Sequence, residues 1–528
     1  MSATRDAGPP GREPVSDDTD DHTGVVATDQ DDTLTAASAK GALWNGATYA
    51  LSKALVLVST IVLARLLVPD DFGLVGIGLL VINYLEIVND FGVSAAVIQR
   101  RDDTDRSADV AFWVNMALGA VLTAIGLVAA PFIADFFQDG RASGIIQALS
   151  ITFFIGSIGA IHESRLRREL AFRSRLVPEL AKGIVKGVVA ISFAAAGAGA
   201  WSLVWAQLAS AVVGSALYWW AMPWRPSFVW DRTIARSLLG FGSQITAVGL
   251  LGTVLRNVDY ILVGRWLGTR ALGLYTLAFR LPQMIVEGVA TIVGQVVFPA
   301  FSQLQDDPVR LRAALSRVLT VTSLIIVPLG LGIALISDPF IRVFYGPRWE
   351  PAISTMQLLA IYMVVQGISR NVGDLYKAIG RPGILTTLAA VKLVVTVPAL
   401  VIAVPHGIVA VAATQVGAAA FATVLDLAMA SRQVDLGWSD IVAMYGPAAR
   451  AGTAMTIACV GVAAATGDWP SGARLAATVV TGAVSYGAVL WTFDRRHAVD
   501  LIALVRRRRG SSHRHAADRR SAPEAPLV

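Results

Sequence analysis

The stretch LVLVSTIVLARLLVPDDFGLVGIGLLV, residues 55–81, joins two apolar runs through a short polar turn. Its first run ends in Ala64-Arg65-Leu66-Leu67, the turn is Pro69-Asp70-Asp71, and the second run begins with Phe72-Gly73-Leu74. With their flanks, both runs reach about twenty residues, the length at which an α-helix crosses a hydrocarbon core about 30 Å thick. The stretch therefore predicts two membrane-spanning helices joined by a tight turn.

The composition of the whole chain agrees with this prediction. Of its 528 residues 55% are hydrophobic and 16% are charged, whereas a soluble protein carries about 25% charged residues. The apolar excess lies in blocks of span length, which excludes a soluble multidomain enzyme. A single cysteine, Cys459, excludes a disulfide framework within the chain.

The apolar blocks predict fourteen membrane helices, with boundaries uncertain by several residues. The expected ranges are about 43–67, 72–96, 109–135, 143–163, 176–198, 200–222, 239–264, 272–302, 314–336, 352–376, 383–404, 407–430, 446–466 and 472–493. The run 176–222 has to be divided at the Gly-Ala-Gly-Ala sequence of residues 197–200.

Loop charges predict the orientation, because membrane proteins place Lys and Arg on the cytoplasmic side. With the N-terminus inside, inward loops hold 18 Lys and Arg residues and outward loops hold 7, so both termini are expected to be cytoplasmic. Residues 1–42 form an acidic tail that we expect to be disordered, and residues 494–528 form a basic tail. The first forty residues lack the basic start and apolar run of a secretory signal peptide.

The turn that joins the first two predicted helices recurs two hundred residues later. Gly264-Arg265-Trp266-Leu267 leads to Leu272-Gly273-Leu274, again as a helix end, an Arg, a short turn and a Gly that begins the next helix. Six spans separate the copies, so both halves would have the same orientation, as in transporters with parallel repeats. The expected fold is an all-α polytopic membrane protein with two six-helix lobes, 43–235 and 236–435, and an extra helix pair, 436–493.

Cationic side chains within the predicted spans indicate an anionic substrate. Inserting an ionisable residue at the centre of a membrane helix costs roughly 2.5–3.5 kcal/mol of free energy, so each such residue is expected to have a structural or functional role. Lys53 and Lys392 have no acidic partner within a turn of their own helices, and Arg256 and Arg280 lie in the seventh and eighth spans. We expect these four to line a hydrated cavity and bind phosphate or pyrophosphate.

Acidic residues in the spans allow a second interpretation, coupling to protons or sodium. Asp259, Glu287 and Asp374 are the candidates, and Asp426 is a further carboxylate that an antiporter could use. Asp259 lies three residues after Arg256, so the pair could instead be neutralised within one helix. A drug or cation antiporter would use such carboxylates, but the cations without a local partner are lysines, which favours an anionic cargo.

Several motifs resemble those of one transporter family. They are Leu63 to Gly73, Val258 to Gly268 with Leu272 to Tyr275, Phe344 to Pro351, and Ala378 to Pro382. Together they resemble the Wzx-like lipopolysaccharide and oligosaccharide flippases of the multidrug/oligosaccharidyl-lipid/polysaccharide (MOP) superfamily. The resemblance implies two helical lobes around a central cavity. It also implies alternating access, with an isoprenoid-pyrophosphate-linked glycan turned from the inner to the outer leaflet.

Other classes of function lack their sequence signals. The six histidines are scattered without metal-ligand spacing, and no nucleotide-binding motif is present, so we expect no metal, no cofactor and no enzyme. The excess of Lys and Arg in the predicted cytoplasmic loops explains the net charge of +6, so we expect no nucleic-acid partner. The expected partners are the lipid-linked oligosaccharide, the bilayer of the bacterial plasma membrane, and a polysaccharide polymerase with glycosyltransferases.

Overall fold

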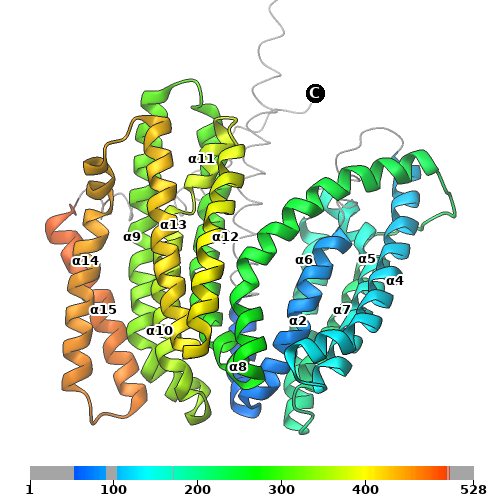
Figure 1. Ribbon diagram of the computed structural model, residues 1–528, viewed down its shortest axis with the longest axis horizontal. Helices are drawn as coiled ribbons and strands as arrows, with labels where there is room; N and C mark the ends of the chain where they lie inside the picture. The colour runs from blue at the N-terminus through cyan, green and yellow to red at the C-terminus, as the bar shows by residue number, and fades with distance from the viewer. Residues whose placement is uncertain (1–52, 91–103, 170–171, 496–498, 500–528) are drawn as a thin grey trace, which may run out of the picture. The chain divides into compact units, whose positions relative to one another are not determined.

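The computed structural model describes residues 53–90, 104–169, 172–495 and 499, and these form helices joined by short turns (Figure 1). All of them belong to one compact unit, Leu51–Val528. No strand occurs among the described residues. The expected tail 1–42 and almost all of the tail 494–528 lie outside them.

The helices follow the expected spans along the chain. The first described helix covers residues 53–66. The others are α2 (Pro69–Asp90), α4 (Thr104–Phe137), α5 (Arg141–Arg168), α6 (Phe172–Ala195), α7 (Trp201–Ala221), α8 (Arg232–Gln303), α9 (Pro308–Phe340), α10 (Ile353–Ser369), α11 (Val372–Ala378), α12 (Gly383–Ala403), α13 (Ile408–Val434), α14 (Trp438–Ala465) and α15 (Ser471–Phe493).

Helix α8 is two membrane helices joined at Gly268. As one straight helix its 72 residues would be about 108 Å long, far more than a bilayer of about 30 Å needs. Gly268 breaks it with φ 84° and ψ 177°, a conformation that favours glycine. Across the break the Tyr275 hydroxyl donates a hydrogen bond of 2.7 Å to Asp259. The first arm (232–267) and the second arm (269–303) therefore fold back on each other.

Ten described segments are long and apolar enough to cross a membrane, and one of them, Arg256–Gln303, runs from the last part of the first arm of α8 through the second arm. The helix 53–66, α2 and α6, which the sequence also predicts to be spans, are not among the ten. The expected all-α, polytopic fold is confirmed, and the number of fourteen spans remains a prediction.

The expected division at residues 197–200 is confirmed. Helix α6 ends at Ala195 and α7 begins at Trp201. Between them Gly197 and Gly199 have φ of 83° and 53°, in the left-handed region that glycine adopts without steric cost. These two glycines therefore make the turn between the helices.

The contacts between helices form two groups. In an amino-terminal group, α5 contacts α2, α4 and α7, and α6 contacts α7. In a carboxy-terminal group, α10 contacts α9 and α13, and α12 contacts α13. Helix α8 contacts both α2 and α10, and the pair α14 and α15 packs on α9. The lobe boundaries 43–235, 236–435 and 436–493 remain predictions.

The two copies of the repeated turn lie against each other where α2 crosses α8. A Cβ at Gly73 would lie 1.8 Å from the carbonyl oxygen of Thr269, and one at Gly273 would lie 1.9 Å from that of Pro69. Such close backbone approach requires a residue without a side chain. Each copy of the repeat thus supplies the glycine on which the backbone of the other copy packs.

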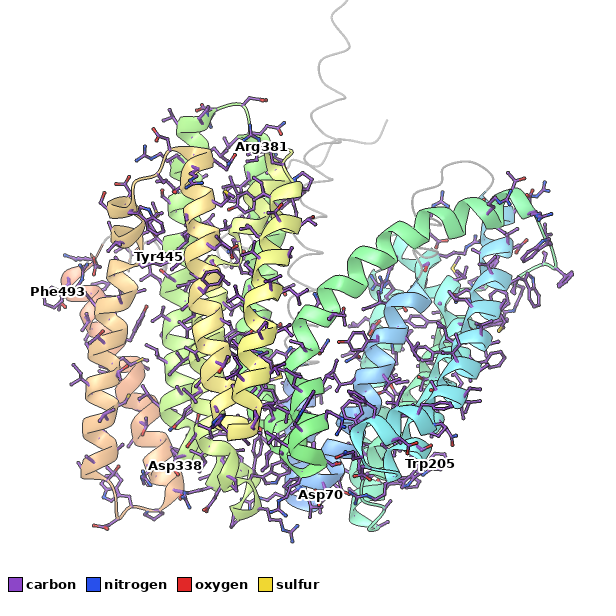
Figure 2. The ribbon with its side chains drawn as sticks, in the orientation of Figure 1. Asp70, Trp205, Asp338, Arg381, Tyr445 and Phe493 are labelled. Atoms are coloured by element: carbon purple, nitrogen blue, oxygen red, sulfur yellow. The ribbon has the colours of Figure 1, made fainter. Side chains whose placement is uncertain are left out.

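At the end of the helices where Asp70 lies (Figure 2), the first hairpin packs against the turn after α9. Arg65 donates hydrogen bonds to the carbonyl oxygens of Val343 and Phe344. The indole of Trp349, which is fully buried, donates to the carbonyl oxygen of Ala64 over 2.8 Å. These contacts join segments that are nearly three hundred residues apart in the chain.

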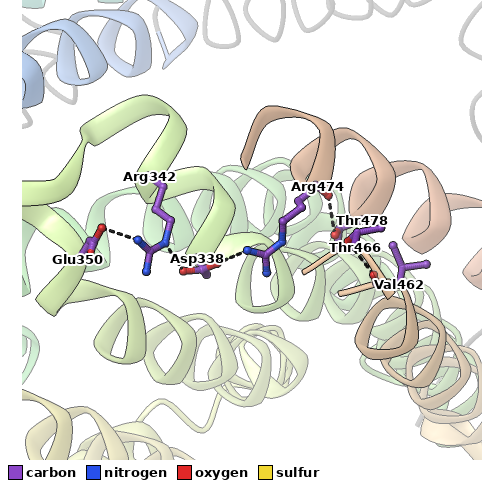
Figure 3. Close-up of polar contacts among 7 residues, drawn as sticks. All are labelled: Asp338, Arg342, Glu350, Val462, Thr466, Arg474 and Thr478. Carbon is purple, nitrogen blue, oxygen red and sulfur yellow. Dashed lines mark hydrogen bonds and ion pairs between the residues drawn. The ribbon is translucent and has the colours of Figure 1, made fainter. Parts of the chain in front are cut away.

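A polar network ties α15 to the end of α9 (Figure 3). The Asp338 carboxylate lies 2.8 Å from Nε of Arg342 and 3.4 Å from Nη1 of Arg474. Arg342 also pairs with Glu350 in the following turn. One carboxylate therefore connects the extra helix pair to the carboxy-terminal group.

Asp139 makes a similar connection in the turn between α4 and α5. Its carboxylate accepts hydrogen bonds from the Arg141 guanidinium and, over 2.7 Å, from the Thr269 hydroxyl of α8. The hydrogen bonds from Arg141 hold the pKa of Asp139 below its usual range. The group is therefore ionised at neutral pH and can hold both partners.

Candidate substrate cavities

The amino-terminal cavity lies among the helix 53–66, α2, α6, α7 and the second arm of α8, and its volume is about 180 Å³. Apolar side chains form much of its wall, including Leu63, Phe72, Val75, Leu79, Leu203 and Leu277. Its uncharged polar lining is Ser59, Thr60, Gln207 and Thr276. A mostly apolar wall with a few polar groups is typical of small-molecule sites.

Two exposed cations line this cavity, Arg280 of α8 and Lys186 of α6. Arg280 forms no ion pair within the described part of the chain. The charged neighbours of Lys186 are Arg280, Lys182 and Glu86, which leaves a positive surplus. The arrangement suits an anionic group placed against an apolar body.

The sequence prediction included Arg280 but missed Lys186. Glu179, Lys182 and Lys186 form one stripe on α6, and the acid can neutralise only one of the two lysines. In the structure Glu179 lies 3.9 Å from Lys182 and also accepts a hydrogen bond from Tyr218. The excess of one lysine in the stripe was the signal that could have identified Lys186.

The carboxy-terminal cavity lies among α8, α10, α11, α12 and α13, and its volume is about 380 Å³. It brings together three residues that the sequence singled out, Arg256, Lys392 and Glu287. Arg370 and Asp426 complete its charged lining. The four predicted cations therefore do not form one cluster, since Arg280 lies in the other cavity.

Lys392 has a partner that its own helix does not supply. Its Nζ lies 2.7 Å and 2.8 Å from the two carboxylate oxygens of Asp426 on α13. The two side chains are 29% and 16% exposed, so solvent screens the pair only in part. A signal for this contact exists in the sequence, because Lys392 and Asp426 are the single ionisable residues of neighbouring predicted spans, 383–404 and 407–430.

We expect Lys392→Met and Asp426→Asn each to lower the thermal midpoint of the purified protein. Each change leaves one charge in the membrane without its partner, and such single removals are strongly destabilising. The double variant should be more stable than the sum of the single losses predicts, with a coupling of about 0.5–3 kcal/mol. Thermal unfolding of all four proteins in one detergent measures the cycle, and additive losses would contradict the pairing.

Asp259 and Arg256 do not pair within their helix, an alternative that the sequence had left open. Asp259 is 1% exposed and accepts its hydrogen bond from Tyr275 of the second arm. Arg256 is exposed and donates to the Thr253 hydroxyl over 2.8 Å. The carboxylate is thus held in the hairpin, while the guanidinium lines the carboxy-terminal cavity.

The remaining predicted residues lie in three different settings. Glu287 lies 3.9 Å from Arg370, a loose ion pair within the carboxy-terminal cavity. Asp374 pairs with Lys377 over 3.1 Å on α11 and lines neither cavity. Lys53 lies on the helix 53–66, one turn before Val56 of the amino-terminal cavity.

Metal chemistry has no evident site in the part of the chain that the structure describes. No group of three or more His, Cys, Asp or Glu side chains there could hold a metal ion. The two cavities are instead lined by apolar side chains, cations, amides and hydroxyls, which can bind a ligand without covalent chemistry.

Comparison with known sequences places this arrangement among proteins of polysaccharide synthesis. A family model described as polysaccharide biosynthesis protein matches residues 62–354, more than half of the chain. Over 371 residues the chain is 26% identical to the lipopolysaccharide biosynthesis protein WzxC of Escherichia coli K12, covering 69% of this chain and 74% of that protein.

Solved structures share the fold at low sequence identity. The lipid II flippase MurJ in an inward closed conformation superimposes with a TM-score of 0.67 at 14% identity, covering 86% of this chain and 98% of MurJ. An inward-facing multidrug resistance MATE family transporter of the MOP superfamily gives 0.59 at 18% identity, covering 74% of this chain and 94% of the transporter. At these identities the likeness shows the fold alone.

Proposed function

Because this chain belongs to the polysaccharide biosynthesis protein family, we propose that it flips a polyprenyl-pyrophosphate-linked oligosaccharide across the plasma membrane for polysaccharide export. The lipid-linked glycan moves from the inner to the outer leaflet by alternating access. The name of its relative WzxC, a lipopolysaccharide biosynthesis protein, supports this substrate class.

The amino-terminal cavity is the observation that carries the proposal. Its apolar wall suits the first isoprenoid units, and Arg280 with Lys186 suits the pyrophosphate. A guanidinium binds phosphate through a planar fork of donors, and an ammonium adds a compact charge. Lys53 lies one turn from the cavity on the face that carries Val56 and Thr60, so it is a further candidate for the passing pyrophosphate.

The predicted cations then have different roles. Arg256 and Arg280 lie twelve residues on either side of Gly268 in the α8 hairpin, which places them at similar depth. Both are exposed, so both can meet the pyrophosphate. Lys392 contributes less to that task, because Asp426 already compensates its charge.

Beyond the first units at the amino-terminal cavity, the isoprenoid tail stays in the bilayer throughout. Removing it from hydrocarbon would cost about 0.8 kcal/mol for each CH₂ group. Only the glycan and pyrophosphate then need the hydrated interior, which is why the charged cavity linings matter and the rest of the tail needs no enclosed site.

Ion coupling is proposed for Asp259 before the other two acidic residues. Asp259 is buried inside the α8 hairpin, where a change in its protonation would alter its bond to Tyr275. Glu287 and Asp374 each have a cationic neighbour, Arg370 and Lys377 respectively. Their charges are therefore partly compensated in this conformation.

The protein acts in the bacterial plasma membrane with both termini on the cytoplasmic side, since the loops then obey the positive-inside rule. It catalyses no covalent chemistry, and it delivers its glycan to a polymerase after glycosyltransferases have built it. The family match and the relatives favour this function over a proton- or sodium-coupled drug or cation antiporter.

Reconstituted protein tests the function directly. Proteoliposomes carrying a fluorescent polyprenyl-pyrophosphate sugar should expose inner-leaflet label to an external reductant only when the protein is present. Protein-free vesicles and vesicles with heat-denatured protein are the controls. Absence of protein-dependent exposure, together with ion-driven efflux of a cationic dye, would establish the antiporter instead.

A further inference from the structure

The carboxy-terminal cavity has a lining that differs in kind from that of the amino-terminal cavity. Besides its charged residues it carries two amides, Gln283 and Gln366, two hydroxyls, Ser369 and Thr423, and the ring of Tyr362. The amino-terminal cavity is mostly apolar and carries surplus cations. The two sites therefore suit different parts of one amphipathic ligand.

Charges in the carboxy-terminal cavity are largely compensated. Lys392 is paired with Asp426, and Arg370 lies 3.9 Å from Glu287. Arg256 adds one more cation, so cations outnumber acids and a bound metal cation is disfavoured. A pyrophosphate is also better served by the other cavity, whose charged lining, Lys186 and Arg280, includes no acidic residue.

The remaining chemistry is that of a polyhydroxylated ligand. Planar amide, carboxylate and guanidinium groups can each donate to or accept from hydroxyls, and Gln283, Glu287 and Arg370 present all three types. The Arg370–Glu287 contact is long enough, and both side chains exposed enough, for ligand hydroxyls to join it. Phe279 and Tyr362, 5.8 Å apart between ring centroids, provide an apolar surface beside these polar groups.

Position also links the cavity to the pyrophosphate. Consecutive residues of the second arm of α8 line the two cavities, Arg280 in one and Phe279 in the other. The two cavities therefore lie against different faces of this arm at the same level of the helix. A group covalently attached to a pyrophosphate at Arg280 is thus a neighbour of the carboxy-terminal cavity, and its volume of about 380 Å³ is within the ~300–1,000 Å³ of small-molecule sites.

We propose that the carboxy-terminal cavity binds the sugar residue attached to the pyrophosphate, and that Gln283 and Gln366 select it through its hydroxyls. This inference rests on the proposed function, because it divides one lipid-linked glycan between two cavities. It makes the carboxy-terminal helices the part of the protein that recognises the glycan.

Binding measured with and without the sugar tests this subsite. The probes are a short-chain polyprenyl pyrophosphate, either bare or carrying one glucose, galactose, N-acetylglucosamine or glucuronate residue, titrated into the detergent-purified full chain. We expect at least one sugar-bearing probe to bind more tightly than the bare probe. Gln283→Leu and Gln366→Leu should each weaken that binding about fivefold to tenfold, with the bare probe unaffected.

Gln147→Leu is the matched control, because Gln147 lies on α5 and lines neither cavity. It should leave all affinities at the wild-type values, and size-exclusion profiles should show that all variants fold. If no sugar strengthens binding to the wild type, or if both cavity variants weaken the bare probe equally, the subsite is wrong. If the wild type does not bind even the bare probe, the proposed function fails and the subsite with it.

Discussion

Arg280→Ala should reduce the rate of lipid-linked glycan translocation in proteoliposomes by about tenfold to a hundredfold. A charge-assisted hydrogen bond contributes about 1.5–3 kcal/mol, and each 1.4 kcal/mol is a factor of ten. Arg280 is exposed at the amino-terminal cavity and has no ion pair within the described part of the chain. Replacing Arg280 therefore deprives no carboxylate of an ion-pair partner. The variant should lose transport activity and not folded protein.

Two companion variants make this result specific. Arg280→Lys keeps the charge but loses the planar fork, so its rate should lie between those of wild type and Arg280→Ala. Arg265→Ala is the control, because it removes another arginine of α8 that lines neither cavity. Arg265 packs on Phe136 and Trp266 near the Gly268 turn. Equal rates for Arg280→Ala and wild type would exclude Arg280 from the pyrophosphate site.

Gly73→Ala and Gly273→Ala should each cause a large loss of folded protein. The added methyl groups would lie 1.8 Å and 1.9 Å from backbone oxygens, a distance that real Cβ atoms do not reach. The helices α2 and α8 would have to separate, and overpacking of this kind typically costs about 1–3 kcal/mol, sometimes more. The measurements are the yield of monodisperse protein and its thermal midpoint.

Gly332→Ala is the control for this pair. Gly332 also lies inside a helix, α9, but an added Cβ there meets no atom within 4 Å. Because alanine favours helix over glycine by up to about 1 kcal/mol, this variant should be at least as stable as wild type. A thermal midpoint of Gly73→Ala equal to that of Gly332→Ala would show that α2 and α8 do not cross as described.

Much of the fold follows from local sequence. The apolar runs of span length, the glycines at 197 and 199, and the repeated turn with its Gly73 and Gly273 are visible in the sequence. The helix positions follow, since membrane hydrocarbon requires every backbone polar group to be bonded within its own segment. The expected span 352–376 falls within one candidate span, Pro347–Ala378, but the sequence did not predict the interruption of the helix between Ser369 and Val372.

The candidate site was harder to predict, because a counter-ion can come from any neighbouring helix. Within their own helices Lys392 had no partner and Arg256 had a nearby acid, Asp259. Packing reversed both relations, giving Lys392 the carboxylate of Asp426 and directing Asp259 to Tyr275. Lys186, which the sequence prediction passed over, lines the amino-terminal cavity with Arg280.

The sequence by itself determined that this chain is an all-helical membrane protein with a repeated hairpin and with cations inside its spans. These properties depend on segment length, hydropathy and residue type, which are local. Only the tertiary structure decided which charges are compensated, and that Arg280 lines one cavity while Arg256 and Lys392 line another. The reason is physical: the electrostatic environment of a side chain depends on neighbours within a few ångströms, and packing brings these from distant parts of the chain.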